Sequence, residues 1–413
     1  MPRKLGIVSH VFPPTWSGQS RVLCLLLKDV PPEQYVLLSS CPDYGKCTTA
    51  EGYIGSLPGK RIELSPSPAD PPPNPGWLRS RYEGLRRRLG WHRAPSEESL
   101  RWRTERICEV ARQESCRALI GCSGDVLDLP ATFRASQALE VPFFAYYFDW
   151  YAQQWTHPAD RAFALASEGQ LLKSAAGVIV PNEALADELA GLYGIQARVI
   201  HNPCDTVPEG DLPEPDSAGD GEVRIVYTGA IYEAQLDALC NVARAIELLG
   251  KPEIRLHLYT ACGASGMGAR TVSHPHIAPS KIRTVHQEAD ILVLPLSFHT
   301  RYPAVIRTSA PGKTGEYLAA GRPILVHAPA GSFVSSYFRR HGCGMVVEED
   351  SPRAVADALR QLLADAELRK RISSAARQRA RSDFDARRVA AEFLQTVFGE
   401  QPAWRQTPAR RSQ

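Results

Sequence analysis

The chain has 413 residues, of which 44% are hydrophobic and 23% are charged, so it is long enough to build two globular domains with sizeable cores. The formal net charge of +3 is too small to indicate nucleic acid as a partner. No apolar run approaches the roughly 20 residues that span a bilayer, and the first apolar segment is too short for a secretory signal. We therefore expect a cytoplasmic protein.

The first half of the sequence alternates short apolar runs with longer amphipathic stretches. A first helix is predicted over 19–28. Solid apolar strands separated by helices are typical of a parallel sheet covered on both faces. We assign this pattern to a first domain over 1–206. Its strands are predicted at 5–8, 35–39, 119–120, 143–147, 177–181 and 197–200.

The alternation stops at 207–222, where proline, glycine and carboxylates predict a linker, and then starts again. We assign a second α/β domain to 223–383, a last helix to 384–400 and a disordered tail to 401–413. Open α/β sheets bind ligands at the carboxyl ends of their strands, so two such domains are expected to hold two substrates across a cleft. The strands of the second domain are predicted at 223–228, 254–260, 291–295 and 323–327, and its helices at 234–250, 352–364 and 366–382.

The ten cysteines and eleven histidines give no sign of a metal or disulfide framework. No CxxC pair is present, and Cys24, Cys240 and Cys343 lie in apolar runs, which predicts buried reduced thiols. His274 and His276 are separated by one residue, and no third ligand is evident. We expect neither a bound metal nor a cofactor.

The segment SAPGKTGEYLAAGRPILVHAP, residues 309–329, carries the strongest chemical signal. We predict a loop followed by a short helix starting near Glu316, whose free backbone N–H groups suit a phosphate. Lys313 adds a positive charge, and Glu316 can accept hydrogen bonds from sugar hydroxyls. The alternative is a capping glutamate beside a solvated lysine.

This segment resembles the C-terminal signature of family 4 GT-B glycosyltransferases, S-x-P-x-K-x-x-E-Y-L-A-A-G-R-P-I-L. The resemblance covers nearly all of the chain except about 42–104. It implies two Rossmann-like domains with parallel sheets, the last helix returning to the N-terminal domain. Other matching segments are LGIVSHVFPPTWSGQSRVLCLL, EGQLLKSAAGVIVPNEALADELAGLYGIQARVIHNPCD, VRIVYTGAIYEAQLDALCNVARAI, EADILVLPLS and DFDARRVAAEFLQTVF.

The resemblance implies transfer of a hexose or related sugar from a nucleotide-diphosphate sugar to an acceptor hydroxyl, with retention and without metal. The acceptor would be a small molecule, a glycan or a lipid-linked saccharide. Asp149 and Lys313 are the implied catalytic residues. The implied positions are Glu316 at the ribose, Ser309, Gly312, Lys313, Thr314 and Gly229 at the diphosphate, and Gly18 and Asp149 on the acceptor side.

Two positions and one segment depart from the family pattern. Thr308 stands where most members carry a second glutamate, and Phe148 where many carry a histidine. The segment after Gly229 lacks the usual Arg and Lys, leaving Lys313 as the main cation, with Arg301 or Arg307 assisting. These departures leave open an alternative, a non-catalytic GT-B-fold protein that binds nucleotide sugar or serves as partner subunit of an active glycosyltransferase.

Two further segments are distinctive. Residues 66–93 begin proline-rich and end in a basic amphipathic helix over 77–93. That helix is expected to pack on its own domain, to contact an anionic inner-membrane surface or to grip an acidic acceptor. Residues 262–269, CGASGMGA, have their glycines in the wrong order for a dinucleotide fingerprint, which favours a flexible loop near the nucleotide base.

Overall fold

The computed structural model describes residues 4–15, 17–40, 57–64, 95–206, 221–260 and 266–399. These residues form two compact units. The first unit contains the described residues up to Ile200 and those from Ala391 onward, and the second unit is His201–Ala390. The predicted segments 77–93 and 401–413 lie outside the described residues, as do most of the predicted linker and the first half of the glycine loop.

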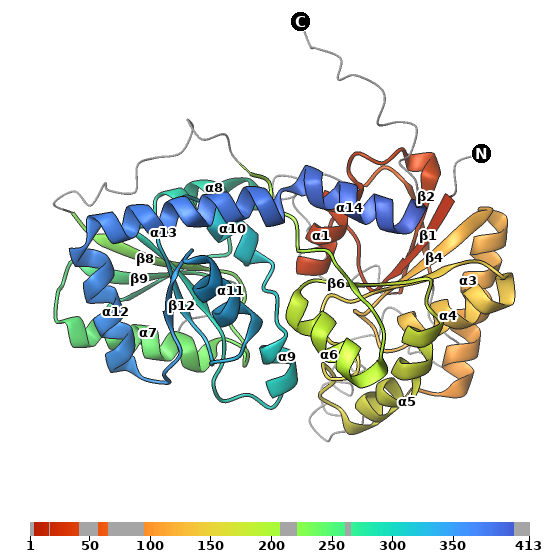
Figure 1. Ribbon diagram of the computed structural model, residues 1–413, viewed down its shortest axis with the longest axis horizontal. Helices are drawn as coiled ribbons and strands as arrows, with labels where there is room; N and C mark the ends of the chain where they lie inside the picture. Colours follow the sequence, from red (N-terminus) through yellow and green to blue (C-terminus); the bar gives the residue numbers. More distant parts are fainter. Residues whose placement is uncertain are drawn as a thin grey trace, which may run out of the picture. The chain divides into compact units, whose positions relative to one another are not determined.

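The first unit is a seven-stranded sheet in the order β3-β2-β1-β4-β5-β6-β7, and every neighbouring pair is parallel. Figure 1 shows helices packed along this sheet. Its strands are β1 (Lys4–Ser9), β2 (Tyr35–Ser39), β3 (Lys60–Glu63), β4 (Cys116–Cys122), β5 (Phe143–Tyr146), β6 (Gly177–Val180) and β7 (Arg198–Val199). Its helices are α1 (Gly18–Leu27), α3 (Glu97–Gln113), α4 (Asp128–Leu139), α5 (Pro158–Ser174) and α6 (Glu183–Tyr193), with a 3₁₀ turn at Pro32–Gln34.

The second unit is a six-stranded parallel sheet in the order β10-β9-β8-β11-β12-β13. Helix α14 (Ala386–Phe398) starts in this unit and ends in the first. The strands are β8 (Val223–Thr228), β9 (Ile254–Tyr259), β10 (Thr271–His274), β11 (Ile291–Pro295), β12 (Ile324–His327) and β13 (Met345–Val347). The helices are α7 (Leu236–Leu249), α8 (Pro279–Gln287), α9 (Pro303–Arg307), α10 (Lys313–Ala319), α11 (Phe333–His341), α12 (Pro352–Ala364) and α13 (Ala366–Arg379).

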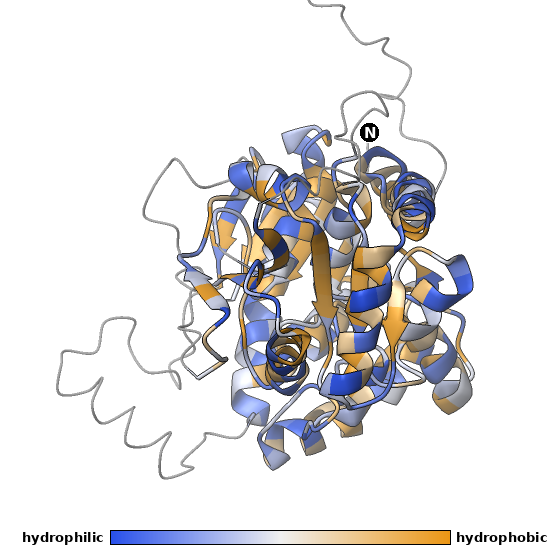
Figure 2. Ribbon diagram, turned by 90° about the vertical axis from the view of Figure 1, so that its left-hand side faces the viewer, coloured by the Kyte–Doolittle hydropathy of each residue, from blue (hydrophilic) through white to orange (hydrophobic). Residues whose placement is uncertain are grey.

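Burial explains why these segments fold as they do. All residues of β2 and β11 are buried, as expected for parallel strands covered on both faces. Figure 2 shows the strands as hydrophobic and the helices as mixed. Helix α12 buries Val355, Leu359 and Leu362, which share one face at helical spacing, and α7 joins it on the same core. The prediction of two parallel α/β sheets is confirmed.

Each sheet has one point where the strand order reverses. In the first sheet it lies between β1 and β4, and in the second between β8 and β11. Ligands of open α/β sheets bind beside the carboxyl ends of the strands at this switch point. The residues that follow those strands are His10 and Ser123 in the first unit, and Gly229 and Leu296 in the second.

Several local expectations differ from the structure. Helix α10 starts at Lys313 rather than near 316, so Lys313 and Thr314 lie in its first turn and not in a loop. The predicted helix over 366–382 ends at Arg379 and continues as a π-helical turn, Ala380–Phe384. Seven described cysteines are free thiols, although Cys240 is half-buried rather than buried. Among the described helices, none is long and apolar enough to cross a membrane.

Candidate functional site

The switch point of the second unit is occupied by the side chain of Lys313. Its Nζ lies 3.9 Å from the centre of the ring of Tyr227, the next-to-last residue of strand β8. Gly229 follows β8 with a φ of +125°, and a Cβ added there would lie 2.8 Å from Lys313 Nζ. The backbone conformation therefore favours glycine, and a side chain at this position would also displace the lysine ammonium. Two residues separated by 84 positions thus meet at the carboxyl end of β8.

The electrostatic state of Lys313 follows from its burial. Loss of solvent lowers the pKa of Lys313 to about 7, and the nearby Glu316 carboxylate opposes that shift only in part. An anion that approached the Nζ would favour the charged ammonium. The arrangement is a candidate anion-binding site, in which a bound anion would restore the charge of the lysine.

Helix α10 is fixed to β8 by a buried hydrogen-bond chain. The backbone N–H of Thr228 donates to Tyr317 Oη at 3.0 Å, and Thr228 Oγ1 lies 2.8 Å from His286 Nε2. Tyr317 is fully buried. Because Tyr317 is one turn after Lys313, this contact sets the position of the lysine against Gly229. Sequence reasoning missed Tyr317, although it lies inside the EYLAAG segment.

The remaining motif residues surround the start of α10. Gly312 precedes the helix and is exposed, Ser309 is half-buried, and Glu316 is half-buried in the first turn. Thr314 is buried, and its hydroxyl has no hydrogen-bond partner among the described protein atoms. Its N–H donates to Pro311 O at 2.9 Å. The structure thus places all the motif residues on one loop and one short helix.

Two residues near the motif are engaged elsewhere. Thr308 is buried at the end of α9, and its hydroxyl donates to Ala304 O at 3.1 Å. This hydroxyl is thus engaged by the backbone of α9, and a threonine has no carboxylate to offer a ligand. Arg301, expected to assist at the diphosphate, is exposed and forms a two-pronged ion pair with Glu233. Arg301 could therefore assist at the diphosphate only after its ion pair with Glu233 breaks.

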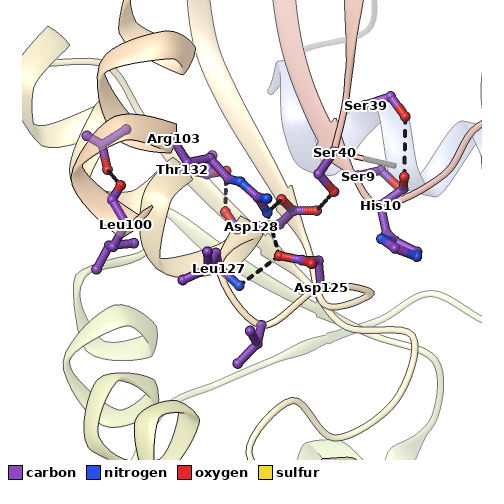
Figure 3. Close-up of polar contacts among 12 residues, drawn as sticks. Ser9, His10, Ser39, Ser40, Leu100, Arg103, Asp125, Leu127, Asp128 and Thr132 are labelled. Carbon is purple, nitrogen blue, oxygen red and sulfur yellow. Dashed lines mark hydrogen bonds and ion pairs between the residues drawn. The ribbon is translucent and has the colours of Figure 1, made fainter. Parts of the chain in front are cut away.

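The switch point of the first unit carries a buried charged network, shown in Figure 3. Arg103 Nη1, from α3, lies 2.5 Å from Asp125 Oδ1 and 2.8 Å from Asp128 Oδ1. Asp128 Oδ2 accepts the Ser40 hydroxyl at 2.8 Å, and Asp125 Oδ1 accepts the Leu127 N–H at 2.9 Å. The network joins the ends of β2 and β4.

The pKa values of the two carboxyl groups in this network shift in opposite directions. Burial and the neighbouring charge of Asp125 raise the pKa of Asp128 to about 7. Although burial also acts on Asp125, Arg103 and His10 hold its pKa below the ordinary value. Burial lowers the pKa of His10, against the pull of Asp125. We interpret this as one ionised carboxylate, one carboxyl that holds its proton near neutrality, and a neutral imidazole beside them.

Asp149 and Gly18 lie in the first unit as well. Asp149 follows β5, and its half-buried carboxylate has a pKa raised to about 6 by burial alone. Ser123, directly after β4, accepts the Phe148 N–H at 2.9 Å and donates to Asp149 O at 3.4 Å. Gly18 is the first residue of α1 and is exposed, and a side chain there would meet no atom, so this helix start does not itself need glycine.

Sequence reasoning missed His10, Arg103 and Asp125. The available signal was positional, since His10 directly follows β1 and Asp125 comes three residues after β4. No group of three or more His, Cys, Asp or Glu side chains in the described ranges is placed to hold a metal ion.

Comparisons with known proteins agree with this architecture. The sequence model of a family described as "Glycosyl transferase-like" matches residues 240–395, which include α10. Sucrose-phosphate synthase from Thermosynechococcus elongatus is similar in structure, with a TM-score of 0.65 and 16% identity over 95% of this chain and 98% of that one. HepE from Anabaena, solved with UDP and glucose, is similar with a TM-score of 0.61 and 13% identity over 96% of this chain and 99% of that one.

A putative UDP-N-acetylglucosamine 2-epimerase from Listeria monocytogenes gives a TM-score of 0.55 and 12% identity over 97% of this chain and 98% of that one. Among curated proteins, none matches the chain in sequence. At these identities the likeness establishes the fold. The chain has the GT-B fold, built from two Rossmann-like α/β domains with parallel sheets.

Proposed function

We propose that this protein is a glycosyltransferase that moves a sugar from a nucleotide-diphosphate sugar to an acceptor hydroxyl. The observation that carries the proposal is the contact of Lys313 with Gly229 at the switch point of the second sheet. A backbone without a side chain, next to a half-buried lysine ammonium, is suited to the close approach of a diphosphate. The family match over 240–395 supports the same assignment.

The donor is proposed to bind the second unit. Lys313 contacts the diphosphate oxygens, with Ser309, Gly312, Thr314 and Gly229 around them. Glu316, one turn further along α10, accepts hydrogen bonds from the ribose hydroxyls. HepE, which shares the fold, was solved with UDP and glucose, so UDP-sugars are the first donors to test.

The acceptor is proposed to bind the first unit, beside Gly18, His10 and Asp149. An acceptor oxygen forms a bond to the anomeric carbon on the same face from which the diphosphate oxygen departs, while the bond from that carbon to the diphosphate oxygen breaks. The electron pair leaves with the nucleoside diphosphate, and Asp149 is the candidate to take the acceptor's proton. Charge on Lys313 stabilises the departing diphosphate, and we propose that the step needs no metal.

Retention of anomeric configuration and a cytoplasmic location are further parts of the proposal. The proposed retention rests on the resemblance of residues 309–325 to the family 4 signature. The basic segment 77–93 is proposed to bring the enzyme to an anionic membrane surface if the acceptor is lipid-linked.

A second candidate is a GT-B-fold protein that binds nucleotide sugar without turnover, as a partner subunit. Thr308 favours it, because its hydroxyl is engaged with Ala304 O where many relatives of the signature carry a glutamate. Binding measurements do not separate the two candidates, whereas product analysis does.

The test is incubation with a panel of UDP- and GDP-sugars and pooled acceptors, followed by mass spectrometry of nucleotides and glycosides. We expect release of one nucleoside diphosphate together with a new glycoside, abolished in Lys313→Met and kept in Lys370→Met, an exposed lysine on α13. An epimerised nucleotide sugar, or tight binding with no product from any donor, would contradict transfer.

A further inference from the structure

Glu168 is a fully buried carboxylate on α5 with four hydrogen-bond donors around it. Its Oε1 accepts the Tyr147 hydroxyl at 3.1 Å and the Ala152 N–H at 3.1 Å. Its Oε2 accepts Trp150 Nε1–H at 3.3 Å and the Tyr193 hydroxyl at 2.7 Å. Four donors on one buried carboxylate offset part of the cost of its loss of water.

The four donors require both side-chain atoms at the end of residue 168 to be hydrogen-bond acceptors. The N–H of Ala152 and the indole N–H of Trp150 can only donate, and they contact different oxygens of Glu168. A glutamine would therefore place its NH₂ group against an N–H in either orientation. Burial raises the pKa of Glu168, and the four donors oppose that shift by favouring the carboxylate.

Three of these donors belong to one short segment, residues 147–152. They lie on both sides of Asp149, with Tyr147 before it and Trp150 and Ala152 after it. A second set of contacts joins the same segment to the end of β4, since Phe148 N–H donates to Ser123 Oγ and Tyr151 Oη to Val126 O at 2.5 Å. In the part of the chain that the structure describes, no hydrogen bond reaches the Asp149 carboxylate.

We propose that Glu168 is a positioning residue that holds the 147–152 segment so that the unbonded carboxylate of Asp149 stays available to the acceptor. Glu168 itself contacts no substrate. Its part in catalysis rests on the proposed function, which assigns Asp149 to the acceptor side. Its part in placing Asp149 is a property of the folded protein and can be measured without substrate.

The first experiment follows the pKa of Asp149 by the ¹³C shift of its carboxyl group, assigned by its loss in Asp149→Asn. Glu168→Gln is compared with Glu105→Gln, an exposed glutamate on α3. We expect the Asp149 pKa to fall toward its ordinary value by about one pH unit or more in Glu168→Gln, because the segment opens to water, and to stay unchanged in the control. An unchanged pKa in folded Glu168→Gln would overturn the proposal.

Two milder variants test the same proposal in case Glu168→Gln does not fold. Tyr147→Phe removes a donor from the Asp149 segment, whereas Tyr193→Phe removes a donor that comes from α6. Positioning predicts that the pKa of Asp149 falls in Tyr147→Phe and not in Tyr193→Phe. Equal changes in the two variants would mean that Glu168 only stabilises the fold.

The second experiment uses the transfer reaction. Glu168→Gln is expected to lower kcat about tenfold or more, to shift the acidic limb of the pH profile and to leave KM for the donor unchanged, with partial recovery in Glu168→Asp. A loss of thermal stability with an unchanged pH profile would overturn the catalytic part. If the wild type transfers no sugar, the proposed function fails, while the NMR result still decides whether Glu168 positions Asp149.

Discussion

The ammonium nitrogen of Lys313 lies 3.9 Å from the ring centre of Tyr227, with Gly229 directly beside it. The aromatic face attracts the charged form, and the loss of water disfavours it. Burial lowers the pKa of Lys313 to about 7, although the Glu316 carboxylate acts in the opposite direction. The free protein therefore carries a lysine that changes its charge near neutral pH.

Binding of a nucleoside diphosphate is expected to draw a proton onto Lys313 above pH 7. At pH 8 the free lysine is mostly neutral and the bound lysine is charged, so binding takes up close to one proton, whereas at pH 6 it takes up almost none. Isothermal titration with UDP in buffers of different ionisation enthalpy measures this uptake. Lys370→Met should keep the uptake and Lys313→Met should lose it. Equal enthalpies in all buffers at pH 8 would contradict the charge change.

Substitution of Gly229 should displace the lysine. In Gly229→Ala the new Cβ would lie 2.8 Å from Lys313 Nζ, and the residue keeps a φ of +125° that alanine rarely adopts. We expect the affinity for UDP to fall about tenfold, because the displaced ammonium loses a charge-assisted hydrogen bond to the diphosphate, which contributes about 1.5–3 kcal/mol. Gly250→Ala is the control, because its φ is also positive and its Cβ meets no atom. Equal loss in both variants would point to backbone strain alone.

The donor half of the site was largely predictable because its residues are close in sequence. Residues 309–316 form one segment whose composition already indicates a phosphate site. The start of α10 was placed too late, because Gly312 and Gly315 made the segment look like a loop. In the structure Gly312 has helical dihedrals and Thr314 N–H donates to Pro311 O, so the first turn forms earlier.

The acceptor half was only partly predictable, because topology and not spacing assembles it. His10 and Asp125 are 115 residues apart, and they approach only because β1 and β4 are neighbours in the sheet. Arg103 comes from α3, in a region with no recognisable motif. The edge strands β3, β10 and β13 were missed for another reason, since they are short and partly exposed, and the apolar run of β13 is only three residues long.

Glu316 is expected to bind the ribose hydroxyls. Glu316→Gln should lower the affinity for UDP by about tenfold or more, since hydrogen bonds to a charged group contribute about 1.5–3 kcal/mol. Titration with 2′-deoxy-UDP and 3′-deoxy-UDP makes the test specific. At least one deoxy ligand should bind the wild type more weakly than UDP and bind Glu316→Gln as well as UDP does. Glu367→Gln, on the exposed start of α13, should behave as wild type. Additive losses would show that Glu316 acts elsewhere.

The stability of the first unit should fall as the pH rises through neutrality, because of Asp128. Its pKa is about 7 in the folded chain and ordinary in the unfolded chain, so the folded state binds more protons between these values. The stability that Asp128 contributes is present at low pH and is lost as the pH rises through 7. Raising the pH from 6 to 8 is expected to cost about 1.4 kcal/mol at this site.

Asp128→Asn is expected to remove this pH dependence, since the amide resembles the protonated carboxyl. Urea unfolding followed by tryptophan fluorescence reports on the first unit, because 201–390 contains no tryptophan. Asp187→Asn, an exposed change on α6, should keep the fall of the wild type. If Asp128→Asn loses stability with pH as steeply as the wild type, the carboxyl of Asp128 is already ionised at pH 6, and Arg103 rather than a proton neutralises it.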